Sequence, residues 1–191
     1  MDIRDLHRRA CEGFAATARA VRPDQWGLPT PCTEWDVRAL VNHVVAEDRW
    51  TSPLVEGRTV TEIGDRFDGD LLGDDPAAAC AAAAAEALDA VGQPGVLERI
   101  VHLSYGDVPA PDYVSELFAD HLVHRWDLAT AIGADARLDA DLVAACATWF
   151  AERESAWRQA GVIGPRLVVS DDADAQTRLL AAFGRSADQS R

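Results

Sequence analysis

The sequence predicts an all-α bundle with four long helices, a small β piece and a short C-terminal appendage. Three observations support this fold class. Apolar residues recur at spacings of three and four along most of the chain, which is the period of one helix face. Only residues 98–109 combine β-branched residues with a turn signal. No repeat and no linker divides the 191 residues, a length typical of one domain.

The first helix is expected over Asp2–Val21, where apolar residues form a single stripe. The second is expected to begin near Thr33, with Thr33 and Asp36 as a capping pair, and to end after Trp50, where Pro53 follows. Its apolar residues occupy two sides, which predicts a helix deep in the bundle.

Residues 56–75 are polar and contain several glycines, so we expect a loop there. A third helix should run from Pro76 to about Val91, with Asp75 as its N-cap. The stretch 98–109 is expected to form an extended segment or a small hairpin.

The fourth helix should start near Pro111 or Asp112 and end near Ala131, with Gly133 as its C-cap. A fifth helix is expected over Asp139–Ala160.

A short extended run at 167–169, a last helix over Asp172–Phe183 and a frayed end at 185–191 complete the prediction. We therefore divide the chain into a bundle, residues 1–165, and an appendage packed on it, residues 166–191.

Composition excludes several classes of function. The net charge is -14, and no basic stripe is present, so we expect neither a nucleic-acid nor a membrane partner. All eighteen basic residues other than His are Arg, which excludes a lysine nucleophile and, with the many alanines, suggests the GC-rich genome of an actinobacterium. Four scattered cysteines and a charged N-terminal stretch predict reduced thiols, no signal peptide and a cytoplasmic location.

Asp120 and His124 are the first candidates for chemistry. They lie four residues apart in the fourth predicted helix and therefore on one face, within an otherwise apolar stripe. A buried carboxylate needs a partner, which a divalent metal ion would supply. A buried Asp–His hydrogen bond, or an exposed polar edge, would explain the same spacing.

His43 strengthens the metal interpretation. It stands in the middle of the second predicted helix, where a lone histidine is most often a hydrogen-bonded core residue. Together with Asp120 and His124, however, it would complete a set of two histidines and one carboxylate. Such a set leaves coordination positions open for water or substrate, which is typical of catalytic metal sites.

Three stretches carry a resemblance to a known family: VRPDQWGLPTPCTEWDVRALVNHVV, HLVHRWDLATAIG and TRLLAAFGR. They resemble an actinobacterial metal-binding family of the DinB-like superfamily, which includes the mycothiol-dependent maleylpyruvate isomerases. The similarity extends over nearly the whole chain. The resemblance implies a four-helix bundle with one divalent metal ion, usually zinc or nickel, bound by three side chains.

The ligand positions of this family match His43, Asp120 and His124, although Asp120 stands where Glu or His is commoner. The shorter side chain would place the metal closer to its helix or bind it through water. His121 is about 100° around the helix from Asp120, so we assign it an orienting or structural role. The isomerases also carry a further C-terminal domain for the thiol cofactor, so maleylpyruvate isomerase activity itself does not follow.

Other residues are weaker candidates. Cys32 could act as a nucleophile near a helix N-terminus, although a half-buried packing cysteine is the commoner case. Asp127 could hold a ligand histidine or an arginine, and a plain surface acid or a helix salt bridge is the simpler interpretation. Glu47 is, with Asp127, a candidate general base. Arg49 and Arg125 could bind an anionic substrate, and Trp50 and Trp126 could line a pocket, although surface charges and core residues are the commoner cases. Asp36, His102 and His7 are interpreted as structural or surface residues.

Three functional hypotheses follow. The first is a transferase or isomerase in which the metal activates a low-molecular-weight thiol such as mycothiol for attack on a small electrophile. The second is a metal-dependent hydrolase. The third is a non-catalytic stress or regulatory module that binds metal and forms a homodimer.

Overall fold

The computed structural model describes residues 2–186, and its architecture is a bundle of long helices. The small elements α3 (Val60–Ile63), η1 (Val96–Glu98), β1 (Ile100–Leu103) and β2 (Gly106–Pro109) lie in the connections. The predicted all-α class with a small β piece is confirmed. The long helices of the bundle are α1 (Ile3–Arg19), α2 (Val37–Val55), α4 (Pro76–Gly92) and α5 (Ala110–Ile132).

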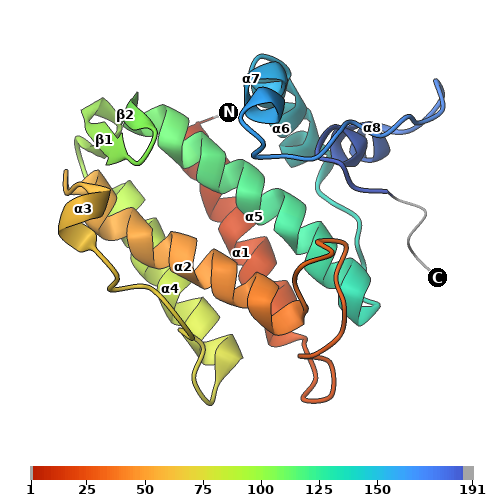
Figure 1. Cartoon of the computed structure of the whole chain (residues 1–191), viewed down its shortest axis with the longest axis horizontal. Helices are drawn as coiled ribbons and strands as arrows, with labels where there is room; N and C mark the ends of the chain where they lie inside the picture. Colours follow the sequence, from red (N-terminus) through yellow and green to blue (C-terminus); the bar gives the residue numbers. More distant parts are fainter. Residues whose placement is uncertain (1, 187–191) are drawn as a thin grey trace.

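The four long helices pack in two pairs that also contact each other. Helix α1 lies along α5 and touches α4, whereas α2 lies along α4 and touches α5 (Figure 1). Side chains from all four helices, among them Phe14, Val41, Cys80 and Leu128, meet in one hydrophobic cluster. Helix α4 contributes mainly alanines, whose small side chains let α1 and α2 approach it closely.

The predicted ends of two helices are confirmed by their caps. The side chain of Asp75 accepts a hydrogen bond from the backbone N–H of Ala78, and Pro76 occupies the first turn of α4. Gly133 ends α5 with a positive φ of 70°, a conformation that favours glycine. The predicted hairpin also forms, with β1 and β2 antiparallel.

The second helix begins later and ends later than predicted. Asp36, not Thr33, caps it by accepting a hydrogen bond from the N–H of Ala39. Residues 30–35 instead form a tight turn held by the side chain of Thr30. Pro53 lies inside α2, which continues to Val55. The predicted loop at 56–75 contains α3, whose capping box joins Thr59 and Glu62.

The predicted fifth helix is broken into α6 (Ala140–Ala151) and α7 (Glu154–Gln159). The break allows the ring of Trp157 to pack against Trp149 and Phe150, with centroid distances of 5.5 and 5.7 Å. In one straight helix these positions would be separated by roughly 11–12 Å along the axis. Tertiary packing therefore decides this break.

The C-terminal elements lie beside α1 and α5. Helices α6 and α8 (Ala175–Ala182) share a hydrophobic cluster with both long helices (Figure 1). Asp174 caps α8, and no strand forms at 167–169. Residues 187–191 of the predicted frayed end lie outside the described residues, and the domain division at residue 165 stays a prediction.

Two further features bear on the sequence predictions. All four cysteines lie in the described part of the chain and are free. Among residues 2–186, no helix combines the length and the apolar character needed to cross a bilayer.

Candidate metal centre and pocket

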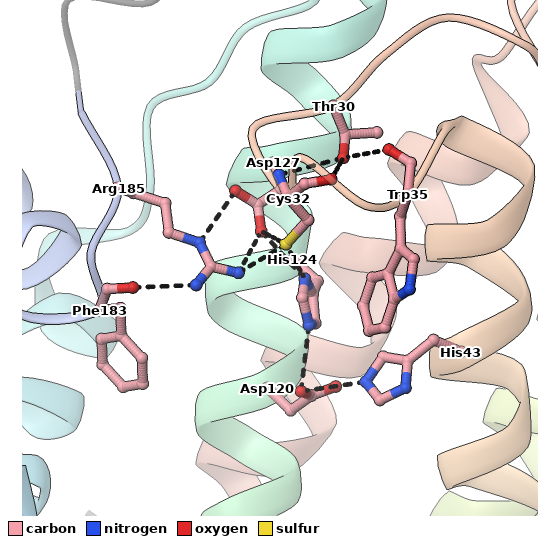
Figure 2. A network of polar contacts seen from close by, with 9 residues as sticks. All are labelled: Thr30, Cys32, Trp35, His43, Asp120, His124, Asp127, Phe183 and Arg185. Atoms are coloured by element: carbon pink, nitrogen blue, oxygen red, sulfur yellow. Dashed lines mark hydrogen bonds and ion pairs between the residues drawn. The ribbon is translucent and has the colours of Figure 1, made fainter. Parts of the chain in front are cut away.

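His43, Asp120 and His124 converge between α2 and α5, as Figure 2 shows. One carboxylate oxygen of Asp120, Oδ1, lies 3.4 Å from Nε2 of His43 and 3.2 Å from Nε2 of His124. One potential ligand atom from each residue lies within 4.8 Å of the other two. Asp120 and His124 are neighbours because residues four apart lie one turn apart on the same helix face.

The second carboxylate oxygen of Asp120, Oδ2, is buried and has no hydrogen-bond partner. Leaving a carboxylate oxygen without a partner costs free energy that a cation would recover. Two imidazole nitrogens beside such an oxygen are a donor set that zinc and related ions accept. The residues therefore fit a divalent metal ion.

At this group, charge interactions shift the pKa values more than burial does. Burial by itself favours the neutral acid, but the imidazoles of His124 and His43 hold the pKa of the Asp120 carboxyl well below its usual range. Burial also opposes charge on His124, yet Asp120 and hydrogen bonding raise the pKa of that imidazole well above its usual value. Asp120 is therefore a carboxylate, the form that ligates metals, whereas His124 must release the proton on Nε2 before it binds one.

Asp127 fixes the orientation of His124. Its Oδ2 lies 2.9 Å from Nδ1 of His124, which directs Nε2 toward Asp120. The guanidinium of Arg185 binds both oxygens of Asp127, at 3.0 and 3.3 Å (Figure 2). Burial raises the pKa of Asp127, but the hydrogen bond with His124 and the charge of Arg185 produce a net lowering. Such outer partners set the orientation and basicity of metal ligands.

Asp127 is fully buried, so its interpretation as a surface acid was wrong. A buried carboxylate in a core helix requires a cation. That requirement is the signal that could have pointed to Arg185, which sequence reasoning placed in the frayed end.

Cys32 lies beside the same network. Its Sγ is 3.4 Å from Oδ2 of Asp127, 4.0 Å from Nδ1 of His124 and 2.7 Å from Nη2 of Arg185. Helix α2 begins only at Val37, so the cation near this thiol is Arg185 and not the helix N-terminus.

The turn at residues 30–35 positions both Cys32 and the ring of Trp35. Thr30 accepts a hydrogen bond from the N–H of Cys32, and its hydroxyl donates to the carbonyl of Trp35. The ring of Trp35 packs against the rings of His43 and His124, at centroid distances of 4.6 and 5.7 Å. The sequence pattern alone did not indicate this role of Trp35.

A cavity of about 440 Å³ opens onto the three candidate ligands. Its lining includes apolar side chains from α5 and from the C-terminal elements, notably Leu117, Trp157 and Phe183. Two acids, Glu47 and Glu116, also line it. A pocket of this size with a few convergent polar groups is typical of a small-molecule site.

The matched family agrees with this arrangement. The sequence matches the family described as "Mycothiol maleylpyruvate isomerase N-terminal domain" over residues 7–129. The chain belongs to this family. The resemblance inferred from the sequence is thereby confirmed for the family, although one of the three stretches that suggested it, TRLLAAFGR at residues 177–185, lies outside the matched span.

Two relatives from Mycobacterium tuberculosis extend the comparison. They are "Uncharacterized protein MT0763" of strain CDC 1551 / Oshkosh and "Uncharacterized protein Rv0738" of strain ATCC 25618 / H37Rv. Each is 37% identical over 146 residues, which cover 74% of this chain and 74% of the relative. No solved structure matches the chain significantly.

The span matched by the mycothiol maleylpyruvate isomerase N-terminal domain family contains the three candidate ligands, Cys32 and Asp127. Arg185 and the aromatic wall formed by Trp157 and Phe183 lie beyond it. This member of the family therefore builds part of its pocket from a segment outside the matched domain.

The remaining sequence candidates lie elsewhere. His121 points away from the pocket and packs inside the bundle, 3.1 Å from Asp48. His102 pairs with Asp107 on the hairpin. The others are structural: Asp36 caps α2, Arg49 pairs with Glu86, Arg125 binds the carbonyl of Arg137, Trp50 packs on Phe67 and Trp126 is buried in the core.

Proposed function

We propose that this protein binds one divalent metal ion, zinc or nickel, through His43, Asp120 and His124. We further propose that it uses the metal with a low-molecular-weight thiol such as mycothiol to transform a small electrophile. The observation that carries the proposal is the bare, buried Oδ2 of Asp120 beside two imidazole nitrogens at the floor of a cavity. A metal ion bound there would lower the pKa of a coordinated thiol and so supply a thiolate at neutral pH.

The chain's own residues prepare this chemistry. Asp127 and Arg185 hold the ring of His124 in place. Trp35 covers the two histidine rings and keeps water from that side. Arg185 also lines the cavity, where its charge suits an anionic substrate or thiol.

Glu47 favours a second candidate function, metal-dependent hydrolysis. Burial and then the charge of Asp120 raise the pKa of this carboxyl, and it lines the cavity one turn after His43. A carboxylate with a raised pKa suits a general base. Asp127, the other predicted base, does not line the cavity and is held by His124 and Arg185. A non-catalytic module would need no cavity of this size.

The first test is metal content, measured on untagged protein and on Asp120→Ala and His124→Ala. We expect about one metal ion per chain at this site, lost in both variants. The matched controls are Asp107→Ala and His102→Ala, because that exposed Asp–His pair on the hairpin lines no part of the cavity. Equal metal content in all four variants would contradict the proposal.

The second test separates the two reactions. The metal-loaded protein is incubated with electrophiles in the presence and absence of mycothiol. Thiol transfer requires turnover only with mycothiol, whereas hydrolysis requires turnover without it and a loss in Glu47→Gln. If no turnover occurs with or without mycothiol, the result would favour the third hypothesis, a non-catalytic metal-binding module that forms a homodimer.

A further inference from the structure

A second group of metal-binding side chains lies inside the bundle, away from the cavity. His7 and Cys11 are one turn apart on α1 and face Asp48 of α2. His121 of α5 closes the group, with its Nε2 3.1 Å from Oδ1 of Asp48. Side chains of all four residues are at most 1% exposed.

Most atoms of this group lack hydrogen bonds. Six buried side-chain nitrogen and oxygen atoms have no hydrogen-bond partner in the described part of the chain. Four of them belong here: both ring nitrogens of His7, Oδ2 of Asp48 and Nε2 of His121, whose ion pair with Asp48 does not have hydrogen-bond geometry. Each unsatisfied buried polar atom costs roughly 1–3 kcal/mol, so their concentration at one point requires an explanation.

An Asp48–His121 ion pair explains only part of the group. It serves one oxygen of Asp48 and leaves the other oxygen, and the whole ring of His7, without a partner. Burial, and then the charge of His121, lowers the pKa of His7 to about 3, so the ring is neutral at physiological pH. A neutral imidazole is the form that binds metals.

The distances suit a metal ion. One potential ligand atom from each of His7, Cys11 and Asp48 lies within 4.8 Å of the other two, and Sγ of Cys11 is 4.0 Å from Oδ1 of Asp48. Donor atoms in a tetrahedral zinc site are roughly 3.3–3.7 Å apart, given bonds of about 2.0–2.3 Å. Small side-chain rotations would close the difference.

His121 is oriented as a ligand. Its Nδ1 lies 2.7 Å from the carbonyl oxygen of Leu117, which can only accept, so Nδ1 carries the proton. Nε2 is therefore the atom directed into the group, toward Oδ1 of Asp48, and it can bind a metal once its own proton is released. Metal-bound histidines are commonly held in this way by a backbone carbonyl.

We propose that His7, Cys11, Asp48 and His121 form a second, closed site for a divalent transition metal of the zinc type. Binding releases two protons to solvent, the thiol proton of Cys11 and the Nε2 proton of His121, and the thiolate and carboxylate together neutralise the charge of the ion. Neutrality matters because an uncompensated charge in the core is costly. The ion would join α1, α2 and α5, and four protein ligands would leave no position for substrate, as in structural sites.

Cobalt binding tests this site independently of the proposed function. The background protein carries His43→Ala and His124→Ala, which remove the candidate ligands of the cavity. We expect this protein to bind about one Co²⁺ per chain and to show a sulfur-to-cobalt charge-transfer band in the near ultraviolet. Adding Cys11→Ser should abolish the band, whereas Cys146→Ser, another buried cysteine on a helix, should leave it unchanged.

Absence of Co²⁺ binding, binding without the sulfur band, or the same band in the Cys11→Ser protein would each overturn the proposal. Folding of every variant is checked by far-ultraviolet circular dichroism. If Cys11→Ser does not fold, a background protein with Cys32, Cys80 and Cys146 changed to Ser retains Cys11 as its single thiol. The band must then appear in that protein, and its absence is decisive against the site.

Discussion

Asp120 uses its two oxygens differently. Oδ1 contacts both imidazoles, whereas Oδ2 is buried without a hydrogen-bond partner. Asp is shorter than Glu or His, so its carboxylate lies close to its own helix. The longer side chains of His43 and His124 would therefore have to extend to a metal ion held there. We therefore expect the charge of this single residue to decide whether the group binds a cation.

Asp120→Asn tests the charge without changing the shape. The amide retains the size of the side chain but not its negative charge, so we expect metal affinity to fall by at least about 100-fold with the fold preserved. Titration with a chelating competitor measures the affinity. Asp107→Asn on the hairpin is the control, and equal affinities for both variants would contradict a ligand role for Asp120.

Arg185→Met tests the outer contacts. Loss of the guanidinium leaves Asp127 without its cation and loosens the ring of His124, so we expect metal affinity to fall about 10–100-fold. The stoichiometry should remain unchanged, because no ligand is lost. Arg137→Met removes an exposed Arg–Asp pair and serves as control. An unchanged affinity in Arg185→Met would assign this arginine to the pocket wall alone.

At the scale of elements, Glu154 links the two ends of a loop that lines the cavity. It accepts hydrogen bonds from Arg158 within α7, at 2.5 Å, and from two nitrogens of Arg166, at 2.7 and 2.5 Å. The hydrogen bond with Arg166 is the largest effect that lowers the pKa of Glu154 in the folded protein. The loop between these residues carries Val162 and Ile163, which line the cavity.

Acidification should therefore weaken this contact. A carboxyl with a lowered folded-state pKa stabilises the fold above its unfolded value, near 4.5, and this contribution is lost as pH falls through the folded-state pKa. At neutral pH we expect Glu154→Gln to cost about 1 kcal/mol in the free energy of unfolding. Urea denaturation should show that this difference shrinks at about pH 3. Glu152→Gln, an exposed neighbour, should have little effect at either pH.

Helix ends were predicted correctly where residues at the end itself mark them. Asp75 with Pro76, and Gly133, fixed the helix ends that the structure confirms. The break near residue 152 has no Gly or Pro to mark it, because it follows from the packing of Trp157 on distant rings. The late start of α2 follows from the turn at Thr30, whose partners lie five residues away.

The residues of the candidate site likewise differ in whether the sequence could predict them. Asp120 and His124 were predictable because helix geometry makes them neighbours. His43 joined them as a polar residue in a second core helix, and the family resemblance then assigned it the same role. Arg185 and Trp157 reach the cavity from remote parts of the chain, so no periodicity indicates them. The ligand roles of His43, Asp120 and His124 stay predictions, because only a measurement of bound metal tests them.

At the scale of the molecule, bound metal should stabilise the fold. A ligand present at about 100 times its dissociation constant adds about 2.7 kcal/mol, which corresponds to roughly 5–11 °C in melting temperature for a chain of this size. We expect this shift when zinc is added to chelator-treated protein, measured by calorimetry. The shift should be smaller in Asp120→Asn. Identical melting temperatures with and without metal would contradict metal binding to the folded state.

The cavity has two origins within one chain. Its floor, with the candidate ligands, lies in the span shared with the family, whereas Trp157, Phe183 and Arg185 come from the segment that follows. We therefore expect exchange of the later segment to change which molecule the cavity accepts, provided that Arg185 is kept, because it holds Asp127 against His124 beside the candidate ligands. Chimaeras joined between α5 and α6 would thus be a practical route to new selectivity.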